Sequence, residues 1–271
     1  LFMLAVIVTC LYPILHVIFA SFSSAGKLMN VSGLLLHPAG FSTAAYEAIF
    51  SNSVILNGYK NTLFILVVGT SINLVMTIAA AYVLSSKDVL WKPVIMMLII
   101  ITMYFQGGLI PTYLNIKNLG LYDTLWSVIL PVAISSYNLI IMRTYFMNIP
   151  DSLLESAELD GAGQFYIFRK MVLPMSTPIL ATVGLITAVS YWNDWTNGLY
   201  YITDAKLFSI QQLLNEMNNN IAFLANNAKD LGGIDLGAIP SATIRLAIAV
   251  VAILPVLIAY PFFQKFFAKG I

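Results

Sequence analysis

The chain has 271 residues, of which 59% are hydrophobic and 9% are charged. A soluble domain is about 25% charged, so this chain has too few polar side chains to cover a soluble globule. The composition excludes a soluble enzyme, a disordered chain and a nucleic-acid-binding protein, and it predicts an integral membrane protein. The net charge of +1 indicates no polyionic partner. One cysteine and two widely spaced histidines offer too few ligands for a transition-metal site.

Six stretches are apolar enough for membrane helices, each of which needs about 20 such residues. They lie near 1–22, 61–84, 94–112, 124–147, 178–199 and 242–264. Alternating segments of the barrel kind are absent, so an all-α polytopic fold is expected, with one transmembrane domain over 1–271. The first span begins at Leu1 without a charged segment or cleavage site. This start indicates a chain trimmed in or just before the span, and not a signal peptide.

The distribution of lysine and arginine predicts the orientation in the membrane. The loop 85–93, the region 143–177 and the C-terminal tail hold seven such residues, and the other side holds six. Short loops decide orientation and long translocated loops count little. We therefore expect both termini in the cytoplasm.

Several predicted spans contain residues that disturb helices, namely Gly107-Gly108, Pro111, Pro131, Pro255 and Pro261. Broken helices are tolerated at membrane depth where the backbone is buried in protein or lines a cavity. These residues predict either ordinary kinks in a packed bundle or a direct role along a substrate path.

The loop 148–177 is expected to form a short helix, a glycine turn and a second short helix. Pro150 suits a first helical turn, and Ser152 and Glu155 have the spacing of a capping box. Gly161 can end the first helix at a positive φ, and Pro174 is expected to end the second. The first helix carries four acids within ten residues: Asp151, Glu155, Glu158 and Asp160.

An exposed acidic helix between two spans has two interpretations. A rigid cytoplasmic projection is suited to fitting a groove in another protein, whereas the alternative is a solvated linker. Composition alone leaves the two equal. Nothing in this stretch can bind a metal tightly or act as a nucleophile with its base.

The same loop resembles the signature EAA-x3-G-x9-I-x-L-P of permease subunits in bacterial ABC importers. The matching residues are Glu155, Ala157, Gly161, Leu173 and Pro174, while Ser156 and Met171 are mild replacements at two further positions. The resemblance implies a type I ABC importer fold of six transmembrane helices with a cytoplasmic coupling helix. It assigns ATPase coupling to Glu155, Ser156, Ala157, Asp160, Gly161, Leu173 and Pro174.

Three further stretches resemble the maltose-type, carbohydrate-uptake branch of this family, within it the group that handles complex oligosaccharides. They are residues 104–113, 191–195 and 260–265. The resemblance implies a bacterial cytoplasmic membrane protein with a second homologous permease, two ATP-binding subunits, an extracytoplasmic solute-binding protein and an oligosaccharide as partners. ATP and Mg would bind the partner ATPase, because this chain has no phosphate-binding Gly-x4-Gly-Lys-Ser/Thr stretch and is expected to hold no cofactor.

The end of the fifth predicted span is a candidate cargo path. It contains Tyr191, Trp192, Asn193, Asp194 and Trp195, and sugar pockets combine apolar walls with a few hydrogen-bonding groups. An acid in a span usually faces protein or water. Two alternatives stay open, because Trp and Tyr also form interfacial belts and Asp194 could pair with Arg245.

Other polar residues have simpler interpretations. Arg143 is expected to extend to the membrane interface, and Tyr82 and Tyr145 are expected to anchor there. The asparagine-rich loop 200–241 could offer a docking surface to the external binding protein, or it could be a partly ordered loop.

The sequence therefore predicts a permease that moves an oligosaccharide by alternating access, driven by a partner ATPase through the 150–161 helix. The chain itself is expected to be no enzyme. One alternative is an ABC importer permease for a non-sugar solute. An ion-coupled secondary transporter would show inverted repeats and midplane ionisable residues, and neither is clear here; a membrane subunit without cargo is a further alternative.

Overall fold

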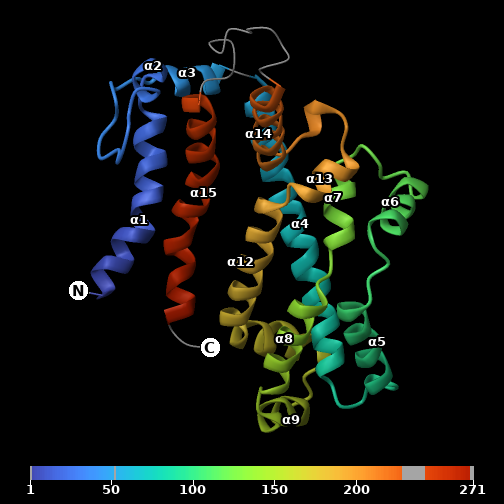
Figure 1. The fold of residues 1–271 in the computed structure, drawn as a ribbon. Helices are drawn as coiled ribbons and strands as arrows, with labels where there is room; N and C mark the ends of the chain where they lie inside the picture. Colours follow the sequence, from blue (N-terminus) through green and yellow to red (C-terminus); the bar gives the residue numbers. More distant parts are fainter. Residues whose placement is uncertain (1, 52, 228–241, 269–271) are drawn as a thin grey trace. The chain divides into compact units, whose positions relative to one another are not determined.

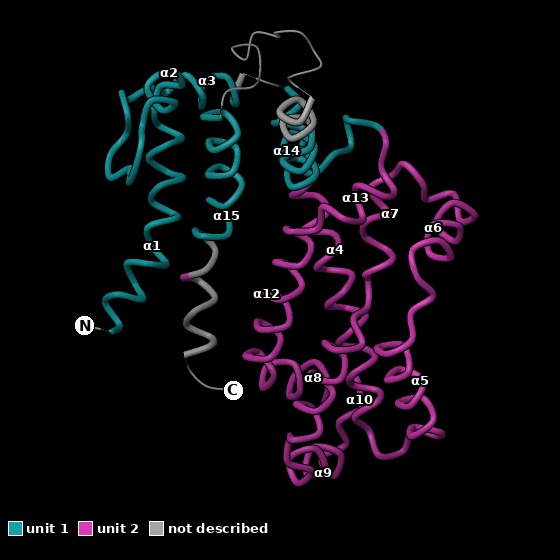
Figure 2. The backbone as a smooth tube through the Cα atoms, in the orientation of Figure 1, with its two compact units in different colours: residues 1–61, 204–258 teal, residues 62–203, 259–271 magenta. Residues whose placement is uncertain are grey.

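A computed structural model of the chain describes residues 2–51, 53–227 and 242–268. In these ranges the chain is helical, and the bridge between Ser23 and Phe41 is an isolated pair outside any strand. The all-α fold expected from the sequence is confirmed. The chain divides into two compact units, residues 1–61 with 204–258 and residues 62–203 with 259–271 (Figure 2). The single domain expected over 1–271 stays a prediction.

The first unit contains α1 (Phe2–Ser21), α2 (Ala25–Leu28), α3 (Ala44–Ser51) and the start of α4 (Ser53–Ser85). From the second half of the chain it contains η3 (Ala205–Leu207), α14 (Ile210–Asn227) and most of α15 (Ala242–Ala268). The Asn61 side chain joins the two parts, because its Nδ2 donates to the carbonyls of Lys206 and Phe208 at 2.8 and 3.1 Å. Part of the 200–241 loop, residues 228–241, lies outside the described residues.

The second unit contains the rest of α4, followed by α5 (Lys92–Tyr104), α6 (Leu109–Asn118), α7 (Trp126–Ile129), η1 (Leu130–Val132) and α8 (Ser136–Met147). After these come α9 (Asp151–Leu159), α10 (Gln164–Ile167), the π-helical η2 (Phe168–Val172), α11 (Leu173–Met175), α12 (Thr177–Asn193) and α13 (Thr196–Tyr201). Within this unit α4, α8 and α12 run side by side, and α9 lies at one end (Figure 1).

The helices agree with the predicted spans in place, but the spans 94–112 and 124–147 are broken, and a third bend lies just before the span 178–199. Among the described residues, α1 and α4 are each long and apolar enough to cross a membrane. Bends of 113°, 46° and 75° separate α5 from α6, α7–η1 from α8, and α10–α11 from α12. Gly107-Gly108 and Pro131 lie at the first two breaks, as expected, whereas α15 continues through Pro255 and Pro261.

An apolar core closes the end of the second unit nearest α9. Its buried residues come from α4, α8, α10, η2 and α12 and include Ala81, Met142, Phe146, Ile179 and Val183. Met142 and Phe146 on α8, and Ile179 and Val183 on α12, are four residues apart, so each of these two helices presents one face to the core. The core supports the loop between α8 and α12.

Candidate functional site

The helix with the acidic cluster, α9, begins one residue after Pro150. Pro150 is the residue preceding the helix, and no side chain caps this end. The capping box expected from Ser152 and Glu155 is therefore wrong, because Ser152 already lies inside the helix. Pro150 fixes the entry of the chain instead, and Asp151 in the first turn places a negative charge near the positive end of the helix dipole.

Gly161 ends α9 as predicted. Its φ is +80°, a conformation that costs a residue with a Cβ atom about 1–2 kcal/mol. The Gly161 N–H donates to the Glu158 carbonyl at 2.9 Å, and the Ala162 N–H donates to the Ala157 carbonyl at 3.0 Å. These two bonds form a Schellman motif, which satisfies carbonyls that the helix end would otherwise leave open.

The second short helix is longer than expected. It continues from Gln164 to Met175, with a π-helical turn at Phe168–Val172, so Pro174 lies inside it and does not end it. The chain then turns by 75° into α12. Pro174 stands just after the π-helical turn and directly before the last residue of this helix, Met175.

The motif residues separate into an anchored group and an exposed group. Ala157 packs with Leu154 and Ala162 against the apolar core, and Leu173 is half-buried. Glu155, Ser156, Asp160, Gly161 and Pro174 are exposed. A small side chain at position 157 lets α9 approach the core closely, while the exposed groups stay available to another protein.

The exposed side of this loop also carries large apolar side chains. Leu159 is 89% exposed and Phe165 72% exposed, and Leu153 and Tyr166 are exposed beside them. These residues lie in the polar loop expected outside the bilayer, so lipid does not account for their exposure. An exposed apolar patch with acidic neighbours is typical of a protein interaction site.

Two tyrosines hold the loop to the bundle, which the sequence interpretation missed. The Tyr82 hydroxyl donates to Gln164 Oε1 at 3.2 Å, and its ring lies 4.6 Å from that of Phe168. The Tyr145 hydroxyl donates to the Met175 carbonyl at 3.2 Å. Both residues were expected to be interfacial anchors, and in the structure they join α4 and α8 to the loop 148–177, which is called the coupling loop below after its proposed role.

Two cations have structural partners as well. Arg143 Nε donates to the Leu84 carbonyl at 2.9 Å, so Arg143 caps the last turn of α4; its expected place at the membrane interface stays a prediction. Lys87 Nζ lies 2.5 Å from Asp151 Oδ2 at the start of α9. The hydrogen bond that Lys87 donates to the Asp151 carboxylate, together with the negative charge of that carboxylate, raises the pKa of Lys87. The pair is exposed, so it orients the loop more than it stabilises the fold.

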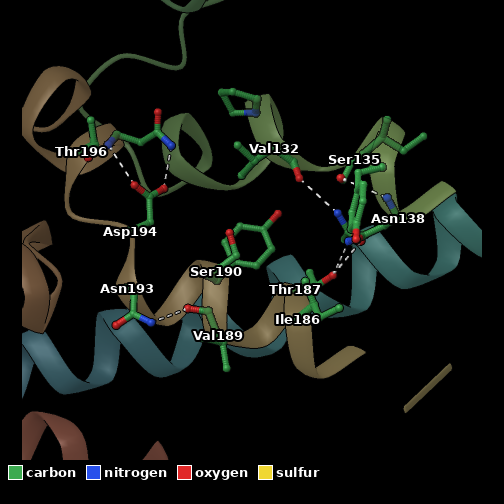
Figure 3. A pocket seen from close by; sticks show the side chains of 16 residues that line it. Val132, Ser135, Asn138, Ile186, Thr187, Val189, Ser190, Asn193, Asp194 and Thr196 are labelled. Atoms are coloured by element: carbon green, nitrogen blue, oxygen red, sulfur yellow. Dashed lines mark hydrogen bonds between the residues drawn. The ribbon is translucent and has the colours of Figure 1, made fainter. Parts of the chain in front are cut away.

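A cavity of about 740 Å³ lies in the second unit, beside the break between η1 and α8. Its wall includes Asn73, Pro131, Val132, Ser135, Tyr137, Asn138, Thr187, Ser190, Tyr191, Asn193, Asp194, Thr196 and Asn197 (Figure 3). The hydroxyls of Tyr137 and Ser190 are free of hydrogen bonds to the described residues. Of the described lining residues, none is lysine or arginine, and Asp194 is the one carboxylate.

The predicted cargo cluster is only partly brought to this cavity. Tyr191, Asn193 and Asp194 line it, whereas Trp192 and Trp195 are not among its lining residues. Tyr191 is 5% exposed and donates to the Ile129 carbonyl at 3.0 Å, so it builds the wall. Sequence reasoning missed Tyr137 and Asn138 on α8 and Ser190 on α12, because no short motif joins these two helices.

Asp194 lies at the end of α12 and not within a helix, since α12 ends at Asn193. Its carboxylate accepts hydrogen bonds from the Asn197 backbone N–H at 3.0 Å and from Asn197 Nδ2 at 2.6 Å. These bonds start α13 and hold the carboxylate at the mouth of the cavity. The pairing with Arg245 that the sequence left open stays a prediction.

The arrangement of broken membrane helices, a polar cavity and an exposed loop helix defines a membrane transport protein. A family model described as "Binding-protein-dependent transport system inner membrane component" matches residues 81–271. The chain belongs to this family, the permeases of binding-protein-dependent ABC transporters. The fold is therefore that of a type I ABC importer permease, as the sequence predicted.

Individual relatives agree with this assignment. The polygalacturonan/rhamnogalacturonan transport system permease YtcP of Bacillus subtilis is 40% identical over 99% of this chain and 93% of its own length. The protein LplC of the same organism is 39% identical over 95% of this chain and 86% of its own. A crystal structure of a bacterial ABC transporter involved in importing the acidic polysaccharide alginate matches with a TM-score of 0.86, at 29% identity over 98% of this chain and 94% of that chain.

Proposed function

We propose that this chain is one permease subunit of an ATP-driven importer that carries an oligosaccharide across the bacterial cytoplasmic membrane. A second, related permease would complete the pathway. Two ATPase subunits would hydrolyse ATP with Mg, and an extracytoplasmic binding protein would deliver the cargo. The observation that carries the proposal is the placement of an exposed, core-anchored loop helix and a polar cavity in one unit of the chain.

The loop 148–177 is suited to receive force from an ATPase. Its exposed acids and apolar side chains offer a surface to a partner, and Leu154 and Ala157 link that surface to the core between α4, α8 and α12. Movement of α9 would therefore be passed to three membrane helices at once. This loop would lie in the cytoplasm together with both termini.

The chemistry of the cavity supports a carbohydrate cargo. Its wall combines apolar side chains with neutral hydrogen-bonding groups, which suits a molecule rich in hydroxyls. Tyr137, Ser190 and Asn193 are the cargo contacts that this chain would offer, and Asp194 would stand beside them. The relatives named for polygalacturonan/rhamnogalacturonan and alginate transport make an acidic oligosaccharide the first cargo to test. The wall that this chain supplies has no lysine or arginine among its described residues, so the carboxylates of such a cargo would face water or the partner permease.

Purification and uptake test the proposal together. An affinity tag on this chain should recover a second permease and an ATPase from membranes of the producing organism. Proteoliposomes of that complex, supplied with the cognate binding protein, should accumulate oligogalacturonides or arabino-oligosaccharides only when ATP is inside. If the complex takes up a non-sugar solute and no oligosaccharide, the cargo class is wrong and the alternative of a non-sugar importer replaces it. Uptake by this chain alone, driven by an ion gradient, would overturn the proposal.

A further inference from the structure

A buried cluster of polar side chains lies between the apolar core and the cavity. Thr187 Oγ1 donates to Asn73 Oδ1 at 3.2 Å, and Asn138 Nδ2 donates to Thr187 Oγ1 at 3.1 Å. Each of these three side chains is at most 4% exposed. They come from α4, α8 and α12, so the hydrogen bonds tie the three bundle helices to one another. We call Asn73, Asn138 and Thr187 the polar triad.

The triad also holds the break that shapes the cavity. The Val132 carbonyl, at the end of η1, is among the groups that a broken helix leaves without an internal partner. Asn73 Nδ2 donates to this carbonyl at 3.2 Å. On the other side of the break, Ser135 Oγ accepts from the Asn138 N–H at 3.4 Å. The 46° bend is thus fixed from α4 as well as from its own chain.

The same helix faces continue from the triad to the core under the coupling loop. On α4, Ala81 follows Asn73 by two turns; on α8, Met142 follows Asn138 by one turn; on α12, Val183 precedes Thr187 by one turn. Ala81, Met142 and Val183 belong to the core that Ala157 packs against. All three triad residues line the cavity, as Figure 3 shows for Asn138 and Thr187. The triad is the layer between the coupling loop and the cavity.

Apolar contacts and hydrogen bonds between α4, α8 and α12 differ in how they respond when one helix moves. Apolar side chains can slide past one another at small cost, but a buried hydrogen bond is directional and costly to leave unmade. A shift of α12 against α4 must carry Thr187 with Asn73 or break their bond, and Asn73 in turn holds Val132 at the cavity wall. The triad therefore links a displacement of the helices to a change in the backbone at the break between η1 and α8.

We infer that Asn73, Asn138 and Thr187 are positioning residues that couple the loop 148–177 to the shape of the cargo cavity. The inference rests on the proposed function, since it assigns the step between ATPase movement and cargo release. The triad residues act through the η1–α8 break. The inference does not require that they touch cargo.

The test needs a signal from the cavity that does not depend on the cargo. Ser190 lines the cavity and is exposed, and Cys10 is the chain's one cysteine. In a Cys10→Ser background, Ser190→Cys reports access to the cavity through its rate of reaction with a water-soluble thiol reagent. The complete transporter in proteoliposomes is measured with no nucleotide and with a non-hydrolysable ATP analogue.

Three variants of the triad helices are then compared. Thr187→Val keeps the shape and removes the hydroxyl, whereas Thr187→Ser keeps the hydroxyl. Thr70→Val is the matched control, because the Thr70 hydroxyl on α4 is buried without a hydrogen-bond partner in the described part of the chain. Thr187→Val removes two buried hydrogen bonds, and their joint loss changes an equilibrium by about tenfold. The ratio of labelling rates between the two nucleotide states should fall by about that factor in Thr187→Val and stay near the parent value in the other two.

Each outcome decides one claim. If the parent complex responds to nucleotide and Thr187→Val responds as Thr70→Val does, the inference is wrong while the proposed function stands. If the cavity of the parent complex ignores nucleotide, the proposed alternating-access function fails and the inference with it. A merely structural role would reduce the yield of Thr187→Val complex but leave the ratio in the recovered complex unchanged, and that result also overturns the inference.

Discussion

Two glycines in the coupling loop differ in what their backbone demands. Gly161 has a φ of +80°, whereas Gly163 has a φ of −72°, and a Cβ atom added at either would meet no atom within 4 Å. Space is therefore the same at the two sites and only backbone conformation differs. This pair separates the role of the Schellman turn from the role of side-chain packing.

We expect Gly161→Ala to weaken the end of α9 by about 1–2 kcal/mol, because alanine opposes the left-handed conformation. ATP-driven uptake should fall in this variant while ATP hydrolysis persists, since α9 would still bind the ATPase but in a looser position. Gly163→Ala is the control and should behave as the parent. Equal activity of the two variants would show that the turn at Gly161 is not needed for coupling.

The hydrogen-bond partners of side chains that were assigned from their type alone could not be predicted from the sequence. Arg143 and Tyr82 stand near predicted span ends, where cations and tyrosines commonly meet the interface. Their actual partners are the Leu84 carbonyl and Gln164, from segments distant in the sequence. Such bonds depend on the tertiary approach of two helices, which no local pattern encodes. Gly161, by contrast, was predictable because its conformation is a local property.

At the scale of helices, α4 and α12 approach closely where Tyr191 packs on Gly69. A Cβ atom at position 69 would lie 2.7 to 2.9 Å from three ring carbons of Tyr191. The ring is held further by its bond to the Ile129 carbonyl. Glycine is therefore required at this contact by the lack of space, and its substitution must displace a wall of the cavity.

Gly69→Ala should lower uptake by moving the Tyr191 ring and separating α12 from α4. Overpacking of this kind typically costs about 1–3 kcal/mol, so the complex should also unfold at a lower temperature. Gly26→Ala, at a site with no atom within 4 Å, provides the control. Thermal unfolding of the detergent-solubilised complex and uptake are measured for both, and a Gly69→Ala complex with the parent's melting temperature would contradict the described contact.

The positions of the helices were predictable from hydropathy, but their bends were predictable only in part. Gly107-Gly108 and Pro131 predicted two breaks, because glycine has a low helix propensity and proline lacks a backbone N–H. Pro255 lies in a continuous helix, and the 75° turn before α12 follows Met175. Whether a proline breaks a helix depends on what the neighbouring helices offer its freed groups. The cavity was unpredictable for the same reason, since its wall is assembled from α4, α8, α12 and α13.

At the scale of the whole molecule, we propose that force enters at the loop 148–177 and that cargo passes the cavity beside the η1–α8 break. In this proposal the exposed motif acids would meet the ATPase, the apolar core would receive the displacement, and the polar triad would pass it to the cavity. Charge reversal at Glu155 is expected to change the surface offered to the ATPase and to leave the core intact. Glu155 is exposed, whereas Ala157 is the residue that packs against the core.

The most direct measurement follows ATP hydrolysis and oligogalacturonide uptake in the same proteoliposomes, for the parent complex and for Glu155→Lys. The account predicts that the parent accumulates sugar as it consumes ATP. The Glu155→Lys complex should assemble and unfold at the parent's temperature yet accumulate no sugar per ATP consumed. Uptake by Glu155→Lys at the parent's rate and stoichiometry would contradict the account.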